Sequence, residues 1–166
     1  MPPLSPLVLD VRPALSDAEL NELFAAAWPG HRAAAFGPVL ERSTAWITAR
    51  RAGRLVGYVN VAGDGGAHAF ILDTTVHPDE RRRGLGVRLV RAAADAARAS
   101  GAHWLHVDHE PHLEGFYLSL IHIPPDQPPK RGPLGQIGDV ATWDHSGSRW
   151  PGRVRPASAQ RASRAR

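Results

Sequence analysis

The sequence contains no cysteine. Disulfide bonds, thiolate metal sites and a cysteine nucleophile are therefore excluded, and the absence fits a reducing compartment. Lysine is almost missing as well, because Lys130 stands alone beside 19 arginines. A nucleotide-binding loop of the Gly-x-x-x-x-Gly-Lys-Ser/Thr type needs a lysine directly after a glycine, and Pro129 precedes Lys130. The sequence therefore excludes that kind of phosphate-binding loop.

Long apolar runs are also missing. No stretch approaches the eighteen or so residues that a membrane-spanning helix needs, and residues 1–6 have no basic leader segment. We therefore expect a soluble, cytoplasmic protein with no membrane partner. The 166 residues suffice for a single hydrophobic core.

The basic charge is confined to one end of the chain. The calculated pI is about 10.6, but residues 1–117 hold 12 arginines against 13 acidic residues. Residues 118–166 hold 8 basic residues against 3 aspartates. A nearly neutral body lacks the electrostatic footprint of a nucleic-acid-binding domain, so the charge distribution argues against a nucleic-acid partner.

Apolar periodicity and turn residues predict a mixed α/β order. The expected elements are a strand at 7–12, a helix at 16–28, a weaker helical piece at 33–42, strands at 45–50, 55–61 and 67–76, a helix at 84–100, a strand at 104–108 and a short helix that begins at Pro111. Ser16 and Glu19 have the spacing of a capping box, and Pro29-Gly30 ends that first helix.

The helix at 84–100 has the strongest pattern in the chain. Its predicted buried stripe consists of Leu85, Leu89, Ala92 and Ala96. Together with the strands before and after it, this helix should form a right-handed parallel β-α-β crossover.

The junction between strand 67–76 and this helix is a predicted phosphate site. Gly84 and Gly86 leave the amides at the helix N-terminus uncovered, and those amides together with the helix dipole favour an anion. A side chain at either glycine is expected to block the site. A dinucleotide-binding fingerprint fits poorly, because Leu89 occupies the position where a third glycine is needed.

The pattern Arg81-x-x-Gly84-x-Gly86 after Val76-His77-Pro78 resembles the coenzyme A pyrophosphate loop of the GNAT superfamily of N-acetyltransferases. The resemblance covers about residues 7–120 and implies a GNAT-like mixed sheet with acetyl-CoA as the acyl donor. It implies that the backbone near Val76 polarises the thioester. The implied coenzyme-binding residues are Thr74, Thr75, Val76, Arg81, Arg82, Arg83, Gly84, Leu85, Gly86 and Val87.

Two residues are candidates for the proton transfers. Tyr117, which follows Phe116, matches the family tyrosine that faces the coenzyme sulfur, and its reference pKa of about 10 keeps it protonated as a general acid. The family resemblance also implies Asp73 as the candidate general base, because relatives often carry an acidic residue at this position, and burial would raise the pKa of its carboxyl. His106 and Asp108 fall on one face of the next strand and are the alternative, acting through water.

The sequence departs from the family after Tyr117. Pro124-Pro125 and Pro128-Pro129 interrupt the chain where two further strands are usual. Residues 124–166 are rich in Pro, Gly, Ser and Arg, a composition that favours disorder. We therefore predict a GNAT-like domain over residues 1–123, without the last two strands, and a disordered tail over 124–166.

The histidines at 103, 106, 109 and 112 recur every three residues, but their spacing puts neighbours on opposite faces of a strand and predicts no metal site. The prediction is an acetyl-CoA-dependent N-acetyltransferase, acting by direct attack of a primary amine, as a monomer or homodimer. The acceptor is an amine-bearing small molecule or protein. The alternative is a catalytically impaired module that binds acyl-CoA.

Overall fold

The computed structural model describes residues 5–107, 111–113, 115–117 and 141–142. Its elements are β1 (Leu7–Val11), α1 (Asp17–Ala27), α2 (Gly37–Arg42), β2 (Ala45–Arg51), β3 (Arg54–Gly63), β4 (His68–Val76), the 3₁₀ turn η1 (Pro78–Glu80), α3 (Leu85–Ala99), β5 (Trp104–Val107), the 3₁₀ turn η2 (Pro111–Leu113) and β6 (Ala141–Thr142). The predicted α/β order is confirmed over the described residues.

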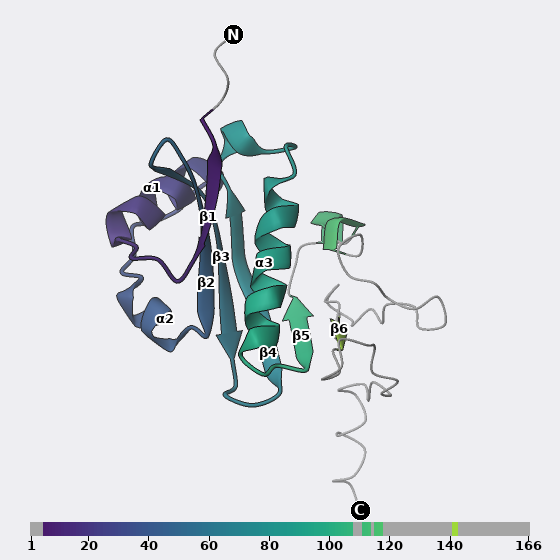
Figure 1. Cartoon of the computed structure of the whole chain (residues 1–166). Coiled ribbons are helices and arrows are strands. Elements are labelled where there is room, and N and C mark those ends of the chain that lie inside the picture. Colours follow the sequence, from purple (N-terminus) through teal and green to yellow (C-terminus); the bar gives the residue numbers. More distant parts are fainter. Residues whose placement is uncertain (1–4, 108–110, 114, 118–140, 143–166) are drawn as a thin grey trace, which may run out of the picture.

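The strands form one mixed sheet in chain order (Figure 1). Strands β1 to β4 run antiparallel to their neighbours, and β4 pairs in parallel with β5. Because α3 lies between β4 and β5 in the chain, this pairing forms the predicted crossover. Hydrogen bonds between β4 and β5 cover only residues 68–71 and 104–107.

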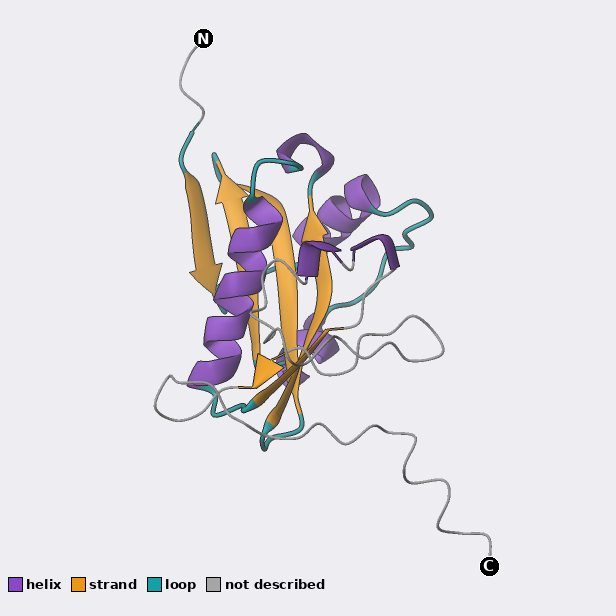
Figure 2. Ribbon diagram, turned by 90° about the vertical axis from the view of Figure 1, so that its right-hand side faces the viewer, coloured by secondary structure: helices purple, strands orange, loops and turns teal. Residues whose placement is uncertain are grey.

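Helices cover both faces of the sheet, with α1 and α2 on one side and α3 on the other (Figures 1 and 2). On the first face Leu20 and Leu23 of α1 pack with Tyr58 of β3. The capping box at the start of α1 is confirmed, since the Ser16 side chain accepts from the Glu19 amide and the Glu19 carboxylate accepts from the Ser16 amide. Burial of an amphipathic face therefore fixes α1 against β3.

The buried stripe of α3 differs from the predicted one. The fully buried residues of α3 are Leu85, Leu89, Val90, Ala93 and Ala97. Ala92 and Ala96 are only partly buried and lie beside this core. The sequence pattern cannot tell which of the alanines in α3 are buried, because the rotation of the helix about its axis relative to the sheet is determined by the tertiary packing.

The structure corrects two of the predicted elements. The helical piece predicted at 33–42 begins at Gly37, with Pro38 in its first turn, where a missing amide hydrogen costs no hydrogen bond. The strand predicted at 104–108 is present from Trp104 to Val107, and residue 108 lies outside the described residues. Ala141 and Thr142, inside the predicted tail, pair antiparallel with β5, so a short strand does follow. The predicted boundary at 123/124 lies outside the described residues.

In the part of the chain that the structure describes, no helix combines the length and the apolar composition needed to cross a membrane.

Candidate active site

A cleft opens where β4 and β5 part. Past Ile71, β4 continues to Val76 without pairing to β5 within the described residues. The register between β3 and β4 shifts between Tyr58 and Asn60, so that Val59 of β3 faces two residues of β4. One of these two residues is Asp73, whose φ is +55°. A β-bulge of this kind bends the strand that contains it.

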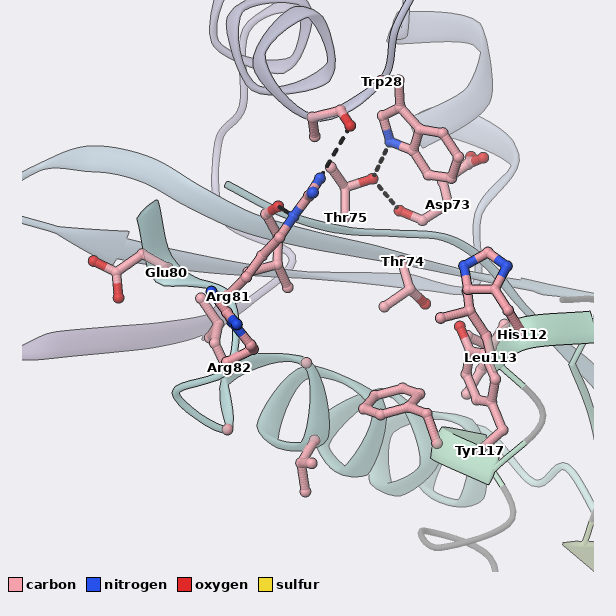
Figure 3. Close-up of a pocket in the computed structure, with 18 of the residues that line it drawn as sticks. Trp28, Asp73, Thr74, Thr75, Glu80, Arg81, Arg82, His112, Leu113 and Tyr117 are labelled. Atoms are coloured by element: carbon pink, nitrogen blue, oxygen red, sulfur yellow. Dashed lines mark hydrogen bonds between the residues drawn. The ribbon is translucent and has the colours of Figure 1, made fainter. Parts of the chain in front are cut away.

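The cleft has a volume of about 1090 Å³. It is lined by the end of α1, the second half of β4, the loop before α3, the first turn of α3, and the residues His112, Leu113, Phe116 and Tyr117. Figure 3 shows Arg81 and Arg82 at one end of the cleft and His112 and Tyr117 at the other. The predicted phosphate site and the predicted general acid therefore share one cavity.

The loop at the start of α3 alternates in backbone conformation. Arg82 has a φ of +58° and Gly84 a φ of +76°, both in the left-handed region. Alternation of this kind turns successive amides toward a common point and forms an anion-binding concavity. A Cβ added at Gly84 would meet no atom within 4 Å. Glycine is therefore needed at 84 for its φ, and the space beside it is open.

Gly86 is required for a different reason. A Cβ added there would lie 3.2 Å from Cζ of Phe116, a contact shorter than carbon atoms prefer. The prediction treated both glycines as uncovering amides. The structure shows that Gly86 also makes room for the ring of Phe116, which lies beside the candidate acid Tyr117.

Arg81 connects the loop to α1. Its guanidinium donates to the carbonyl oxygens of Ala27, at 3.0 Å, and Val76, at 3.3 Å. The first of these carbonyls ends α1, where the helix dipole favours a positive charge. Arg81 thus holds the loop between two elements as well as adding charge to the cleft.

Glu80 connects the turn η1 to strand β2. Arg51 of β2 donates to its carboxylate from Nε, at 2.7 Å, and from Nη2, at 3.0 Å. The Glu80 side chain is buried, and these hydrogen bonds, followed by the charge of Arg51, lower its pKa. A paired carboxylate of this kind fixes the turn η1, and with it the start of the phosphate loop.

The predicted coenzyme-binding residues converge on the cleft with one exception. Nine of the ten line it. Arg83 does not, and its guanidinium points to the Glu80 carboxylate at 3.8 Å. The sequence cannot separate three adjacent arginines, because the left-handed φ at Arg82 decides which of them faces the cleft.

Tyr117 is buried in the wall of the cleft, with its ring 5.0 Å from that of Phe116 in an edge-to-face arrangement. Burial raises the pKa of Tyr117 above its usual value. The nearby hydroxyl of Thr74 lowers the pKa of Tyr117 and so offsets part of this rise. Thr74 Oγ1 is buried and has no hydrogen-bond partner among the described residues. A phenol with a raised pKa stays protonated through neutral pH and can donate to a leaving thiolate.

Asp73 lies on the side of β4 that faces α1, and burial raises the pKa of its carboxyl. Beside it is Trp28, whose Nε1 donates to Thr75 Oγ1 at 3.1 Å (Figure 3). Sequence reasoning missed Trp28. The available signal was its position, because a tryptophan directly follows the last turn of α1 and precedes Pro29-Gly30.

His106, one of the two alternative bases, lies away from the cleft. His106 does not line it, and its Nε2 lies 2.8 Å from Nδ1 of His68 on the neighbouring strand. Asp108 lies outside the described residues. Among the residues that the structure places, no group of three or more His, Asp or Glu side chains is arranged to hold a metal ion.

Comparison with known proteins gives the family of this chain. A family model for the acetyltransferase (GNAT) family matches residues 16–120. Mycothiol acetyltransferases of Mycolicibacterium vanbaalenii and Nocardia farcinica are 35% identical over 71 residues and 37% identical over 62 residues. These matches cover 43% and 37% of this chain. The chain covers 24% and 20% of the two relatives, a quarter of their length or less.

Two solved structures have a similar fold. A GNAT family acetyltransferase of Streptococcus pneumoniae gives a TM-score of 0.60 at 22% identity, covering 69% of this chain and 85% of that chain. A GNAT family N-acetyltransferase of Escherichia coli, in complex with CoA, gives 0.57 at 18% identity, covering 70% and 69%. At these identities the likeness shows the fold. With the family model matching most of the chain, the protein belongs to the GNAT acetyltransferase family.

Proposed function

We propose that the protein transfers an acetyl group from acetyl-CoA to a primary amine by direct attack. One observation supports this most: a single cleft has an anion-binding helix N-terminus at one end and Tyr117 at the other. An elongated thioester with a diphosphate fits such a cleft, with its charged part at the loop and its reactive end near the tyrosine.

In this proposal the pyrophosphate lies against the amides of residues 82–87. The pantetheine amides pair with the backbone of residues 74–76, because this part of β4 does not pair with β5 within the described residues. Such pairing adds a strand-like ligand to a sheet. The backbone N–H near Val76 then polarises the thioester carbonyl.

The chemistry requires protons to move both at the amine and at the sulfur. Asp73 takes a proton from the acceptor ammonium, and the free amine attacks the thioester carbonyl to give a tetrahedral intermediate whose nitrogen is positively charged. When the C–S bond breaks, the electron pair leaves with sulfur, and Tyr117 supplies the proton that yields CoA thiol. The nitrogen releases its second proton to water, and the Tyr117 phenolate regains a proton from water. A raised pKa makes Asp73 a stronger base, and the raised pKa of Tyr117 keeps it protonated until this step.

Two measurements test the proposal. Calorimetry should show 1:1 binding of acetyl-CoA, and release of CoA thiol should depend on added amine in a panel of primary amines and amine-bearing peptides. Acetylated product should appear in equal amount to the thiol. Acetyl-CoA binding without amine-dependent turnover across the panel would instead support the alternative of an acyl-CoA-binding module.

A further inference from the structure

Trp28 is held in a fixed position although it is not buried. Its side chain is 42% exposed, yet its Nε1 donates to Thr75 Oγ1 at 3.1 Å. Thr75 is 2% exposed, and its Oγ1 donates in turn to the carbonyl oxygen of Asp73 at 2.9 Å. The indole is therefore connected through one buried hydroxyl to the backbone of the candidate base.

Asp73 presents a charged group beside this indole. Its left-handed φ of +55° is unusual for a residue other than glycine, and such strain clusters at functional sites. The bulge places its side chain on the same side of β4 as Trp28, whereas Tyr117 lies across the strand (Figure 3). An amine approaching Asp73 from the α1 side therefore meets the indole as well.

The surface that continues from Asp73 is apolar. Leu72 is 38% exposed and lines the cleft with Trp28. Two residues earlier on the same face of β4, Phe70 is 40% exposed, and its ring stacks on that of His106 at 4.7 Å. Adjacent exposed apolar side chains that end at a carboxylate suit a ligand with one cationic end and an apolar body.

We propose that Trp28 determines acceptor specificity, with the acceptor ammonium between its indole and the Asp73 carboxylate and an apolar or aromatic body along Leu72 and Phe70. The acceptor class is thus a primary amine on an apolar or aromatic body. This inference rests on the proposed function, since it assigns the amine side of the same cleft.

The test measures binding of phenethylamine to the CoA-loaded protein by calorimetry. Propylamine keeps the charge and lacks the ring, and 2-phenylethanol keeps the ring and lacks the charge. Phenethylamine should bind about 10-fold or more tighter than either control, because each control loses one of the two contacts. Equal affinity of phenethylamine and either control, or no binding of phenethylamine, would overturn the proposal.

Two variants separate recognition from a structural role of Trp28. Trp28→Leu should weaken phenethylamine about 3- to 30-fold, while Trp28→Phe, which keeps a ring and loses the hydrogen bond to Thr75, should stay within about 3-fold of the wild type. The CoA dissociation constant should be unchanged in both and verifies the fold. If the Phe variant is as impaired as the Leu variant, Trp28 only connects α1 to β4 and the proposal fails.

Acetyl transfer is measured on the same protein preparations with acetyl-CoA in place of CoA. Tight, Trp28-dependent binding of phenethylamine without formation of N-acetylphenethylamine would contradict the proposed function and leave the acceptor site standing. Transfer to phenethylamine with an unchanged KM in Trp28→Leu would do the reverse, because the reaction would then be present and the assigned specificity residue wrong.

Discussion

Replacing Gly86 by alanine tests whether the phosphate loop and the catalytic end of the cleft are coupled through Phe116. The new Cβ would lie 3.2 Å from Phe116 Cζ and 3.5 Å from Cε2, so the ring must move by a few tenths of an ångström. Overpacking costs about 1–3 kcal/mol, and alanine in place of glycine inside a helix returns about 1 kcal/mol. The free energy of unfolding should therefore fall by no more than about 2 kcal/mol.

The effect on function should appear in turnover. The displaced ring of Phe116 contacts Tyr117, so kcat should fall by a larger factor than the affinity for CoA. Gly84→Ala is the matched control with the opposite pattern. Its Cβ meets no atom, but a left-handed φ costs a non-glycine residue about 1–2 kcal/mol, which corresponds to about 5- to 30-fold weaker CoA binding if the loop bears the strain.

The assay combines calorimetry with CoA, steady-state kinetics with the best amine of the panel, and a double-mutant cycle. Phe116→Leu removes the ring atoms that the new Cβ would meet, so the kcat loss of Gly86→Ala should be smaller in the Phe116→Leu background than alone. Additive losses in the cycle would falsify the contact as the cause. So would a Gly86→Ala protein that loses CoA affinity while Gly84→Ala keeps it.

Three further predictions concern the side chains around the cleft. Tyr117→Phe should lower kcat by about 10²-fold with little change in CoA affinity, and wild-type turnover with chemistry rate-limiting would make the tyrosine structural. Asp73→Asn should abolish the acid limb of the pH–rate profile. In the wild type this limb should lie above the ordinary pKa of an aspartate, because burial raises the pKa of Asp73. An acid limb that is unchanged in the variant would show that another group is the base. Glu80→Gln should lower the melting temperature at neutral pH, and the melting temperatures of variant and wild type should converge in acid. The reason is that the hydrogen bonds from Arg51 lower the Glu80 pKa and stabilise the fold only while the carboxylate is charged. Glu41→Gln, on the exposed side of α2, is the control and should leave the melting temperature unchanged at both pH values. Equal melting temperatures of the Glu80→Gln and Glu41→Gln variants would show that the ion pair of Glu80 with Arg51 does not stabilise the fold.

The sequence alone determined the features whose causes are local. The capping box of Ser16 and Glu19, the glycines at 84 and 86 and the amphipathic pattern of α3 depend on residues within a few positions of one another. Short-range steric and hydrogen-bonding preferences therefore sufficed to predict the element order and the position of the glycine-bearing loop before α3, and the family resemblance followed from that loop.

Only the tertiary structure decided the features that depend on distant segments. The bulge that turns Asp73 toward α1 arises from the register of β4 against β3, which no local pattern encodes. Trp28 meets Thr75 across 47 residues of chain, and Arg51 meets Glu80 across 29. These contacts depend on how the helices and strands pack, and packing fixes side-chain positions that periodicity leaves open. The glycine-bearing loop at one end of the cleft could therefore be predicted from the sequence, whereas the position of Trp28 in the cleft could not.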